Sequence, residues 1–394
     1  MKKRLAFVLG IRPELIRASL IIKQLRRYSD LELVFIWSGQ HYSDTLKSVF
    51  FRDLDVAPAE IDLECRGSTD AEIVASVIAR LFPVLAGLRP EAAVFLGDTN
   101  TTLGAIAAAQ LNIPIVHIEG CLRSYDWRMP EEKYRTIVDH VADVIYTYNE
   151  EYKEQGVREG LNPANIVVVG NPIVDVLNEY YYTRRKTYEA MASDDFFQRR
   201  GLKRGQFFLM TCHRRENVHI EESFRAILDL MSAAPYPVYF PASYRTQKVI
   251  AESRLQLPET LRMVDPIGYE EMLALMVNAR GVITDSGTVV EETCVLGIPS
   301  LQLRKATERP QVYDVGSSVK FDPAQAARYP AATVFRKLEA LRGRTWQHNL
   351  GDGRSSERIA VDLHRRLIEG DLARHKPHHY HLPILRSYRE DGLD

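Results

Sequence analysis

Short apolar runs alternate with amphipathic stretches through the first half of the chain. The runs are short enough for buried strands, and the intervening stretches carry apolar residues at the three- and four-residue spacing of helices. The segments predicted as strands are 5–9, 31–37, 94–96, 113–118, 144–146 and 166–169. The segments predicted as helices are 14–27, 42–53, 70–85, 101–111 and 150–159. This alternation favours a doubly wound parallel sheet with helices on both faces.

The pattern changes near Gly170-Asn171-Pro172 and then starts again. Residues 173–191 form a helical stretch rich in Tyr and Arg, and residues 192–203 are polar without a clear period. A second alternating set follows, with strands at 207–210, 238–240, 263–264, 281–284 and 300–303, helices at 223–231, 246–255, 270–278 and 289–296, and closing helical stretches at 322–341 and 355–369. The sequence therefore predicts a second sheet of similar architecture.

The fold class expected from these patterns is α/β, with two Rossmann-like doubly wound parallel-sheet domains. We expect the first domain over residues 1–171, the second over 172–365, and a tail over 366–394 that packs back on the first domain. The tail carries His375, His378, His379 and His381, but clustered histidines at a chain end are more often solvated or docked than metal-bound. We therefore predict no metal site.

Composition restricts the class of protein further. The apolar share of 45% and charged share of 26% are ordinary for a globular protein, and a formal net charge of -1 favours neither nucleic acid nor an anionic membrane as a partner. No apolar run approaches the length of a membrane span, and the N-terminal apolar run lacks a small-residue cleavage site. The four cysteines are far apart without metal spacing, which fits a reducing cytoplasm.

Carboxylates follow two neighbouring predicted strands. Asp98 comes directly after strand 94–96, and Glu119 follows strand 113–118. Because ligands of open parallel sheets bind beyond the carboxyl ends of the strands, both side chains are expected at one ligand site. A third acidic element, Pro130-Glu131-Glu132, opens the next helix. Such a cluster requires a cationic partner or performs carboxylate chemistry.

Two arginines follow the first strand. Arg12 lies in the turn Gly10-Ile11-Arg12-Pro13-Glu14, and Arg17 lies about one helical turn further on. Guanidinium groups suit phosphate, and this turn also lies at a strand's carboxyl end. The alternative is an ordinary strand–helix turn with solvated arginines.

The second half offers a cationic set after its own strands. His213 and Arg214 follow the strand at 207–210, and Arg309 follows the strand at 300–303. Histidine titrates near neutrality and neighbouring arginines form an anion site, so we interpret these residues as functional. A lone histidine would more often be structural.

A small-residue loop leads into the helix predicted at 289–296. Its residues Ser286, Gly287 and Thr288 offer backbone N–H groups and a helix dipole to a phosphate, while Glu292 could accept ribose hydroxyl groups. The alternative is an ordinary N-cap at Ser286 or Thr288. No GxGxxG or Walker loop occurs in the sequence, which argues against a dinucleotide cofactor or an ATPase, and no cofactor is expected.

Together these motifs resemble those of the UDP-N-acetylglucosamine 2-epimerases. The matching segments, in family order from about residue 10 to residue 310, are GIRPE, SGQH, GDTNTT, HIEGCLRS, PEEKYR, GNPIVD, HRREN, TDSGTVVEE and TERP. The resemblance implies a GT-B fold whose two Rossmann-like domains face a central cleft. UDP would bind mainly to the C-terminal domain and the sugar would face the N-terminal domain. It also implies a C-terminal helix that crosses back to the first domain.

The resemblance also implies roles for the residues singled out above. Asp98, Glu119 and Glu131 would transfer protons at the sugar, and His213 would lie near the leaving diphosphate. The expected UDP-binding set is Arg12, Arg17, Arg214, Ser286, Gly287, Thr288, Glu292 and Arg309. Arg17 stands where the family commonly has Lys, and Thr288 replaces the second Gly of a usual S-G-G.

The implied reaction inverts C2 of UDP-GlcNAc to give UDP-ManNAc without a redox cofactor, in a cytoplasmic homodimer that supplies polysaccharide biosynthesis. Elimination of UDP would make the otherwise inert C2 proton removable, with cations stabilising the departing diphosphate. A hydrolysing 2-epimerase that releases ManNAc and UDP, or a 2-epimerase of a related UDP-N-acetyl sugar, remains an alternative. A GT-B glycosyltransferase is more remote, because three acidic elements fit proton transfer better than acceptor activation.

Overall fold

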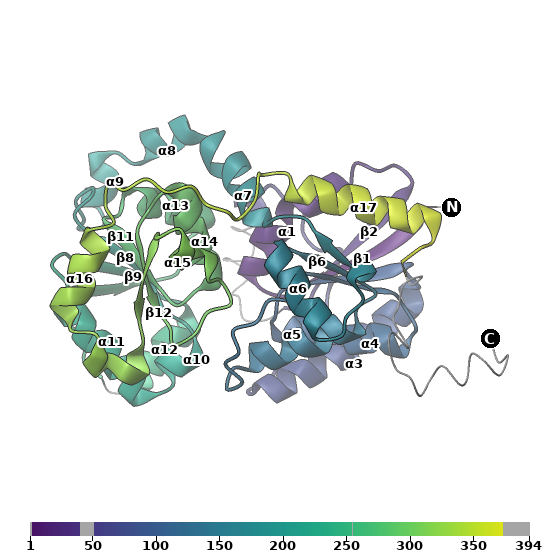
Figure 1. The fold of residues 1–394 in the computed structure, drawn as a ribbon, viewed down its shortest axis with the longest axis horizontal. Coiled ribbons are helices and arrows are strands. Elements are labelled where there is room, and N and C mark those ends of the chain that lie inside the picture. The colour runs from purple at the N-terminus through teal and green to yellow at the C-terminus, as the bar shows by residue number, and fades with distance from the viewer. Residues whose placement is uncertain (1, 40–50, 254, 373–394) are drawn as a thin grey trace. The chain divides into compact units, whose positions relative to one another are not determined.

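The computed structural model describes residues 2–39, 51–253 and 255–372, and it divides into two compact units (Figure 1). Among the described residues, unit 1 comprises 2–39, 58–171 and 354–372, and unit 2 comprises 51–57, 172–253 and 255–353. A division falls directly after Asn171. The described residues 51–57 belong with unit 2, and the chain returns to unit 1 at Arg354.

Unit 1 contains a parallel sheet with the strand order β3-β2-β1-β4-β5-β6-β7 among its described residues. The strands are β1 Lys3–Leu9, β2 Leu31–Trp37, β3 Ile61–Asp62, β4 Ala92–Leu96, β5 Ile115–Ile118, β6 Val144–Thr147 and β7 Ile166–Val168. The chain builds the sheet outward from β1 in both directions, first to β2 and β3 on one side and then to β4 through β7 on the other. Such a reversal leaves a crevice beyond the strand ends, where ligands of doubly wound sheets bind.

Helices cover both faces of this sheet (Figure 1). They are α1 Arg12–Leu25, α3 Asp70–Leu88, α4 Ala105–Gln110 after the 3₁₀ turn Asn100–Gly104, α5 Pro130–Val141, α6 Glu150–Arg158 and α17 Ser355–Glu369. The last of these packs beside α1. Two side chains of α17 contact the rest of unit 1. Asp362 accepts a hydrogen bond from Tyr146 Oη at 2.9 Å, and the ring of His364 stacks on Tyr28. Helix α17 therefore packs within unit 1, and residues 373–394 of the predicted tail lie outside the described part.

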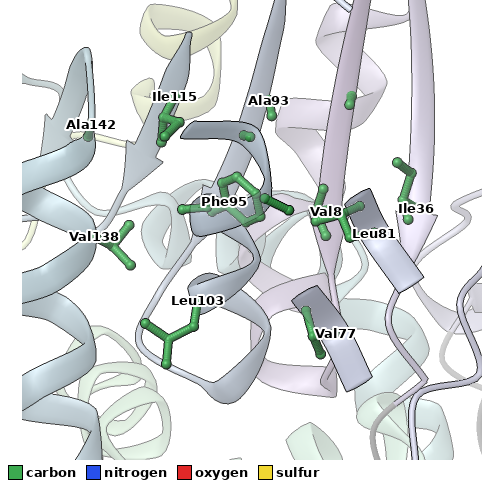
Figure 2. Close-up of a cluster of buried hydrophobic side chains, with 14 of the residues drawn as sticks. Val8, Ile36, Val77, Leu81, Ala93, Phe95, Leu103, Ile115, Val138 and Ala142 are labelled. Atoms are coloured by element: carbon green, nitrogen blue, oxygen red, sulfur yellow. The ribbon is translucent and has the colours of Figure 1, made fainter. Parts of the chain in front are cut away.

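The core of unit 1 lies between its central strands and α3, as Figure 2 shows. Phe95 and Val8, on adjacent strands, are almost fully buried against Val77 and Leu81 of α3. Burying a phenylalanine completely contributes about 2–3 kcal/mol, so strand β4 is fixed firmly beneath the residues that follow it.

Helix α3 meets the length and composition criteria for crossing a membrane, which the sequence analysis did not anticipate. The core helix of a globular domain can meet the same criteria. In α3, Ile73, Val77 and Leu81 are buried in the core, while Phe82 is 41% exposed. The helix begins with a capping box in which Thr69 Oγ1 accepts from the Glu72 N–H at 3.2 Å.

Unit 2 contains a second parallel sheet, with the order β10-β9-β8-β11-β12-β13. Its strands are β8 Phe208–Thr211, β9 Val238–Pro241, β10 Leu261–Val264, β11 Gly281–Thr284, β12 Ser300–Leu303 and β13 Ser318–Phe321. Its helices are α7 Pro172–Leu177, a π-helical turn Asn178–Tyr182, α8 Arg185–Met191, α9 Asp194–Gln198, α10 Arg215–Val218, α11 Glu221–Ser232, α12 Tyr244–Ser253, α13 Tyr269–Asn278, α14 Gly287–Leu296, α15 Gln311–Asp314 and α16 Ala331–Glu339. The α/β class with two parallel sheets is confirmed.

Candidate active site

Asp98 and Glu119 lie at the carboxyl ends of adjacent strands in unit 1. Strands β4 and β5 pair in parallel up to Leu96 and Ile118, and each carboxylate follows within two residues. Gly97 makes the turn before Asp98 with a φ of +83°, and its N–H donates to Ile118 O at 3.0 Å. The two carboxylate-bearing loops are therefore tied together by the backbone.

Glu119 is held by two donors. Arg17 of α1 forms a buried salt bridge with its carboxylate, and Tyr148 Oη donates to the same oxygen at 2.9 Å. Both charged side chains are nearly inaccessible, at 5% for Arg17 and 1% for Glu119. Breaking such a buried pair by removing one partner typically costs about 3–5 kcal/mol. Arg17, predicted as a phosphate ligand, therefore lies against the carboxylate.

Asp98 belongs to a second ion-paired group. The guanidinium of Arg135 on α5 contacts Asp98 through Nη2 and donates to Glu132 Oε2 through Nη1 at 2.7 Å. Arg135 is fully buried, whereas the Asp98 side chain is 20% exposed. Glu131, the carboxylate chosen from the sequence, lies half-buried in the first turn of α5.

The neighbouring Glu132 is the carboxylate that enters this network. It is 1% exposed and accepts from the backbone N–H groups of Ser124 at 2.9 Å and Tyr125 at 2.8 Å. It thereby holds the loop 119–125, in which Glu119, Cys121 and Tyr125 all have positive φ values. Non-glycine residues in this conformation cost about 1–3 kcal/mol each, and such strain concentrates at functional sites. Glu132 therefore fixes the shape of this loop. The sequence analysis named Glu132 only as part of the acidic element Pro130-Glu131-Glu132, and it did not single out Arg135.

Glu14 lies beside the same acidic group. It is 2% exposed, and it accepts from Gly10 N at 2.7 Å, from Ile11 N at 3.2 Å and from the Thr99 hydroxyl. Burial raises the pKa of Glu14 to about 7; the charge of Asp98 acts in the same direction, and the three donors partly oppose it. Glu14 thereby links the loop carrying Arg12 to the loop carrying Asp98.

Arg12 is half-buried at the first position of α1. The preceding Gly10 is required by close approach, because a Cβ there would lie 2.0 Å from Thr101 Oγ1 and 2.1 Å from Ser38 Oγ. The backbone of this turn is therefore closely packed, which fixes the position of the Arg12 backbone.

In unit 2, Asp285 organises the loop after β8. Its carboxylate accepts from the backbone N–H groups of His213 at 3.0 Å and Arg214 at 2.9 Å, and from Asn217 Nδ2 at 3.0 Å. His213 Nδ1 lies 3.4 Å from Asp285 Oδ1, and the imidazole is half exposed. Burial raises the pKa of Asp285, but His213, Arg214 and the N–H donors outweigh it and lower the pKa overall. Asp285 thus holds His213 and Arg214 as an ionised carboxylate.

The start of helix α14 combines the predicted small-residue loop with a buried arginine. Ser286 is the N-cap, with Oγ accepting from Val289 N at 3.5 Å, and Gly287 and Thr288 form the first turn. A Cβ on Gly287 would lie 2.8 Å from Arg309 Cζ. The glycine is therefore needed for packing over the guanidinium, independently of any ligand.

Arg309 itself is buried in a network of charges. Its Nε lies 2.9 Å from Glu291 Oε1 and its Nη1 donates to Glu308 Oε1 at 2.6 Å. Arg304 and Arg214 also contact Glu308, at 2.8 and 3.5 Å. Arg309, predicted as a phosphate ligand, therefore already forms ion pairs with Glu291 and Glu308. Its guanidinium also packs against Gly287 in the first turn of α14.

Glu292, predicted as a ribose acceptor, is 2% exposed on α14. Its Oε1 accepts a hydrogen bond from Tyr269 Oη at 2.8 Å. Gln40 and His41 of the SGQH motif and the histidines at 375–381 lie outside the described residues. Within the described ranges, no group of three or more His, Cys, Asp or Glu side chains could hold a metal ion.

Comparisons with known proteins agree with the geometry. A family model described as UDP-N-acetylglucosamine 2-epimerase matches residues 23–364. The UDP-N-acetylglucosamine 2-epimerase of Methanocaldococcus jannaschii is 32% identical, with 90% of this chain and 97% of that protein covered. The UDP-2,3-diacetamido-2,3-dideoxy-D-glucuronate 2-epimerase of Pseudomonas aeruginosa is 30% identical, with 90% and 98% covered.

Solved structures give the same result. The crystal structure of the Methanocaldococcus jannaschii UDP-GlcNAc 2-epimerase in complex with UDP-GlcNAc and UDP superimposes with a TM-score of 0.80 at 31% identity, covering 92% of this chain and 99% of that one. The UDP-GlcNAc 2-epimerase from Neisseria meningitidis bound to UDP-GlcNAc gives 0.75 at 25% identity, with 92% and 100% covered. The motifs, the two parallel sheets and these matches place the chain in the UDP-N-acetylglucosamine 2-epimerase family.

Proposed function

We propose that this chain interconverts UDP-GlcNAc and UDP-ManNAc by inverting C2, without hydrolysing the product. The observation that carries the proposal is the pair of carboxylates at the ends of β4 and β5. Asp98 and Glu119 are each ion-paired with an arginine, in a chain that belongs to this family. Carboxylates fixed in this way are suited to proton transfer at a substrate carbon.

The reaction proceeds by elimination and re-addition. A carboxylate takes the proton from C2 while the C1–O bond breaks, and UDP leaves with the bonding electrons. The product of this step is a 2-acetamidoglucal with a C1=C2 double bond. Re-addition returns a proton to the opposite face of C2 as the diphosphate oxygen attacks C1. Elimination is favoured because the negative charge develops on a diphosphate that protein cations stabilise.

Unit 1 supplies the proton chemistry in this proposal. Asp98 is the more accessible of the two strand-end carboxylates, and it is therefore placed to meet the C2 proton. Glu119 and Glu131 complete the acidic set, and Arg12 carries positive charge to the phosphate side. The 1% exposure of Glu119 and its salt bridge to Arg17 support a carboxylate that keeps one position throughout the reaction.

Unit 2 binds the nucleotide and stabilises the leaving group. His213 and Arg214 face the diphosphate, the backbone N–H groups of Ser286, Gly287 and Thr288 bind phosphate oxygens, and Glu292 accepts from the ribose. Arg309 acts from beneath Gly287, where its pairing with Glu291 and Glu308 fixes the loop. Arg17 contributes through Glu119 and not by direct phosphate binding. No cofactor is required, because the proton and the UDP oxygen are both returned.

One experiment separates this function from its alternatives. UDP-GlcNAc is incubated with the enzyme alone in heavy water, and the anomeric region is followed by NMR. Formation of UDP-ManNAc with deuterium at C2 supports the proposal. Free ManNAc and UDP would identify a hydrolysing enzyme, and no turnover without an acceptor would favour a glycosyltransferase.

A related UDP-sugar is the second candidate, because the Pseudomonas aeruginosa relative named for a UDP-2,3-diacetamido-2,3-dideoxy-D-glucuronate is about as similar as the UDP-GlcNAc enzymes. Offering both sugars under the same conditions and comparing kcat/KM decides between them. The sugar with the higher kcat/KM is the better candidate for the natural substrate.

We also propose that the enzyme is a cytoplasmic homodimer. Helix α3 carries the exposed Phe82 beside the partly buried Val74 and Ile78, an apolar face that a second copy could cover. The four cysteines are buried free thiols, which suits a reducing compartment. Sedimentation of the wild type and an F82E variant tests the dimer, which the charge at this face should weaken.

A further inference from the structure

His117 lies fully buried on strand β5, two residues before Glu119. Its Nδ1 is 2.7 Å from Asp139 Oδ1 on α5, and its Nε2 is 2.8 Å from the carbonyl oxygen of Gly97. Both ring nitrogens therefore meet an oxygen at hydrogen-bond distance. One of these oxygens belongs to the residue before Asp98.

The two oxygens are both acceptors. A backbone carbonyl can only accept, so Nε2 must carry a proton. Asp139 is ionised, because its Oδ2 accepts from Cys121 N at 2.9 Å and lies 2.8 Å from Arg123 Nη2. Nδ1 therefore donates as well.

We propose that His117 is a buried imidazolium that positions the two strand-end carboxylates of the active site. Its Nε2–H holds the Gly97 carbonyl, while the Gly97 N–H donates to Ile118 O at 3.0 Å. The two peptide groups that flank Gly97 are thus each held by a hydrogen bond, and the second of them leads directly into Asp98. A neutral ring with its proton on Nδ1 would instead turn a lone pair toward the Gly97 carbonyl at 2.8 Å, which is repulsive.

The surrounding charges support a cation at this position. Asp139 faces the imidazole, Arg123 pairs with both Asp139 and Glu159, and the Cys121 thiol is the remaining titratable group of this cluster. Burial raises the pKa of the Cys121 thiol, so the thiol stays neutral. With His117 charged, two cations and two carboxylates alternate through the cluster, which is the arrangement that a buried charge requires.

The packing leaves little freedom for another arrangement. A Cβ on Gly120 would lie 2.6 Å from Asp139 Oδ1 and 3.1 Å from His117 Nδ1. The backbone of the loop after β5 therefore closes directly over the ion pair. A rotated imidazole or a shifted carboxylate would collide with this loop, which is the loop that begins at Glu119.

The protonation state is tested directly on the wild-type enzyme. The protein is labelled with ¹⁵N at the imidazole of histidine, and ¹⁵N NMR spectra are recorded at pH 8, where a solvated imidazole with an ordinary pKa of about 6.5 is mostly neutral. The inference predicts one histidine whose two ring nitrogens both carry slowly exchanging protons. The resonance is assigned by comparison with H117Q, or with H117N if H117Q does not fold. An unprotonated Nδ1 or Nε2 at His117 overturns the inference.

The positioning role is tested by kinetics, and this part depends on the proposed function. H117Q is expected to lower kcat about 100-fold with little change in KM, since a small misplacement of a catalytic group has an effect of this size. The matched control is H140Q, because His140 is exposed on the same helix as Asp139. An H117Q variant that folds and keeps the wild-type kcat overturns the role.

The outcomes also separate the two proposals. A doubly protonated His117 in an enzyme that does not epimerise UDP-sugars would support the buried imidazolium and reject the function. An active epimerase with a singly protonated His117 would support the function and reject the buried imidazolium.

Discussion

Replacing Glu14 by glutamine should change how the stability of unit 1 depends on pH. Glu14 is 2% exposed, and burial raises its pKa from 4.5 to about 7. The side chain accepts from the Gly10 and Ile11 N–H groups and from the Thr99 hydroxyl. Glutamine has nearly the same shape and does not titrate, so E14Q removes the ionisation while keeping the volume.

The sign follows from proton linkage. Between pH 4.5 and pH 7 the unfolded chain has released the proton of Glu14, whereas the folded protein still holds it. Stability therefore falls as pH rises through this window, which is the reverse of the usual carboxylate behaviour. A shift from 4.5 to about 7, at about 1.4 kcal/mol per pH unit, corresponds to about 3 kcal/mol. The loss is complete above pH 7.

The assay is urea unfolding of wild type and E14Q at pH values from 4 to 8, followed by fluorescence, for which Trp37 is a buried reporter in unit 1. The free energy of unfolding of wild type minus that of E14Q should fall by about 3 kcal/mol across the series. Other groups titrate in both proteins and cancel in this difference.

Glu72 provides a matched control. It accepts from the Ser68 and Thr69 N–H groups at the start of α3, much as Glu14 does at α1, but its carboxylate is exposed. Hydrogen bonds from Ser68 lower its pKa. The corresponding difference for E72Q should therefore change in the opposite direction, with stability lost as the pH falls. A difference for E14Q that stays constant, or that rises with pH, would refute the reasoning about Glu14.

The remaining predictions concern the active-site loops. G287A should weaken UDP binding about tenfold, or about 1.4 kcal/mol by titration calorimetry, because the new Cβ would lie 2.8 Å from Arg309 Cζ; unchanged affinity would contradict the packing argument. D285N should destabilise unit 2 by about 2 kcal/mol in denaturant unfolding and should lower kcat, because it weakens charge-assisted bonds to the loop of His213. D98N should slow deuterium exchange at C2 by at least about 100-fold, measured by NMR, because it removes a proton acceptor.

Much of the fold follows from the sequence, because its central strands are continuous apolar runs. Segments 31–37, 281–284 and 300–303 match strands β2, β11 and β12 in full. Two strands were not predicted, β3 at Ile61–Asp62 and β13 at Ser318–Phe321. Both lie at sheet edges with partly exposed residues, so their sequences lack an apolar run.

Helical stretches were harder to delimit where the helix type changes. The predicted stretch 173–191 contains a π-helical turn, in which Thr183 N donates to Asn178 O at 3.0 Å. The i→i+5 hydrogen bonds of a π-helical turn do not follow the 3.6-residue period from which helices were predicted. The predicted stretch 322–341 is a 3₁₀ segment and then α16, separated at Pro330. The described part of the helix predicted at 42–53 is helical at 51–53, and residues 42–50 lie outside the described part.

The sequence analysis named candidate carboxylates and cations, but it could not say which of them pair with one another. Strand order decides the pairing, and the sequence does not give strand order. Arg17 reaches Glu119 because β4 and β5 follow β1 in the sheet, and Asp285 reaches the His213 loop because β11 lies beside β8. The carboxylate paired with Arg135 is Glu132, one residue from the predicted Glu131, because Glu132 and Arg135 lie three residues apart on the same face of α5.

The proton at C2 provides the most direct test of the central claim. The enzyme is given UDP-GlcNAc in heavy water, and the position and extent of deuterium in the recovered UDP-sugars are measured by NMR and mass spectrometry. Elimination and re-addition predict UDP-ManNAc that carries one deuterium at C2 and intact UDP at C1. UDP-ManNAc formed without deuterium at C2 would contradict the mechanism, and a failure to form any C2 epimer would contradict the function.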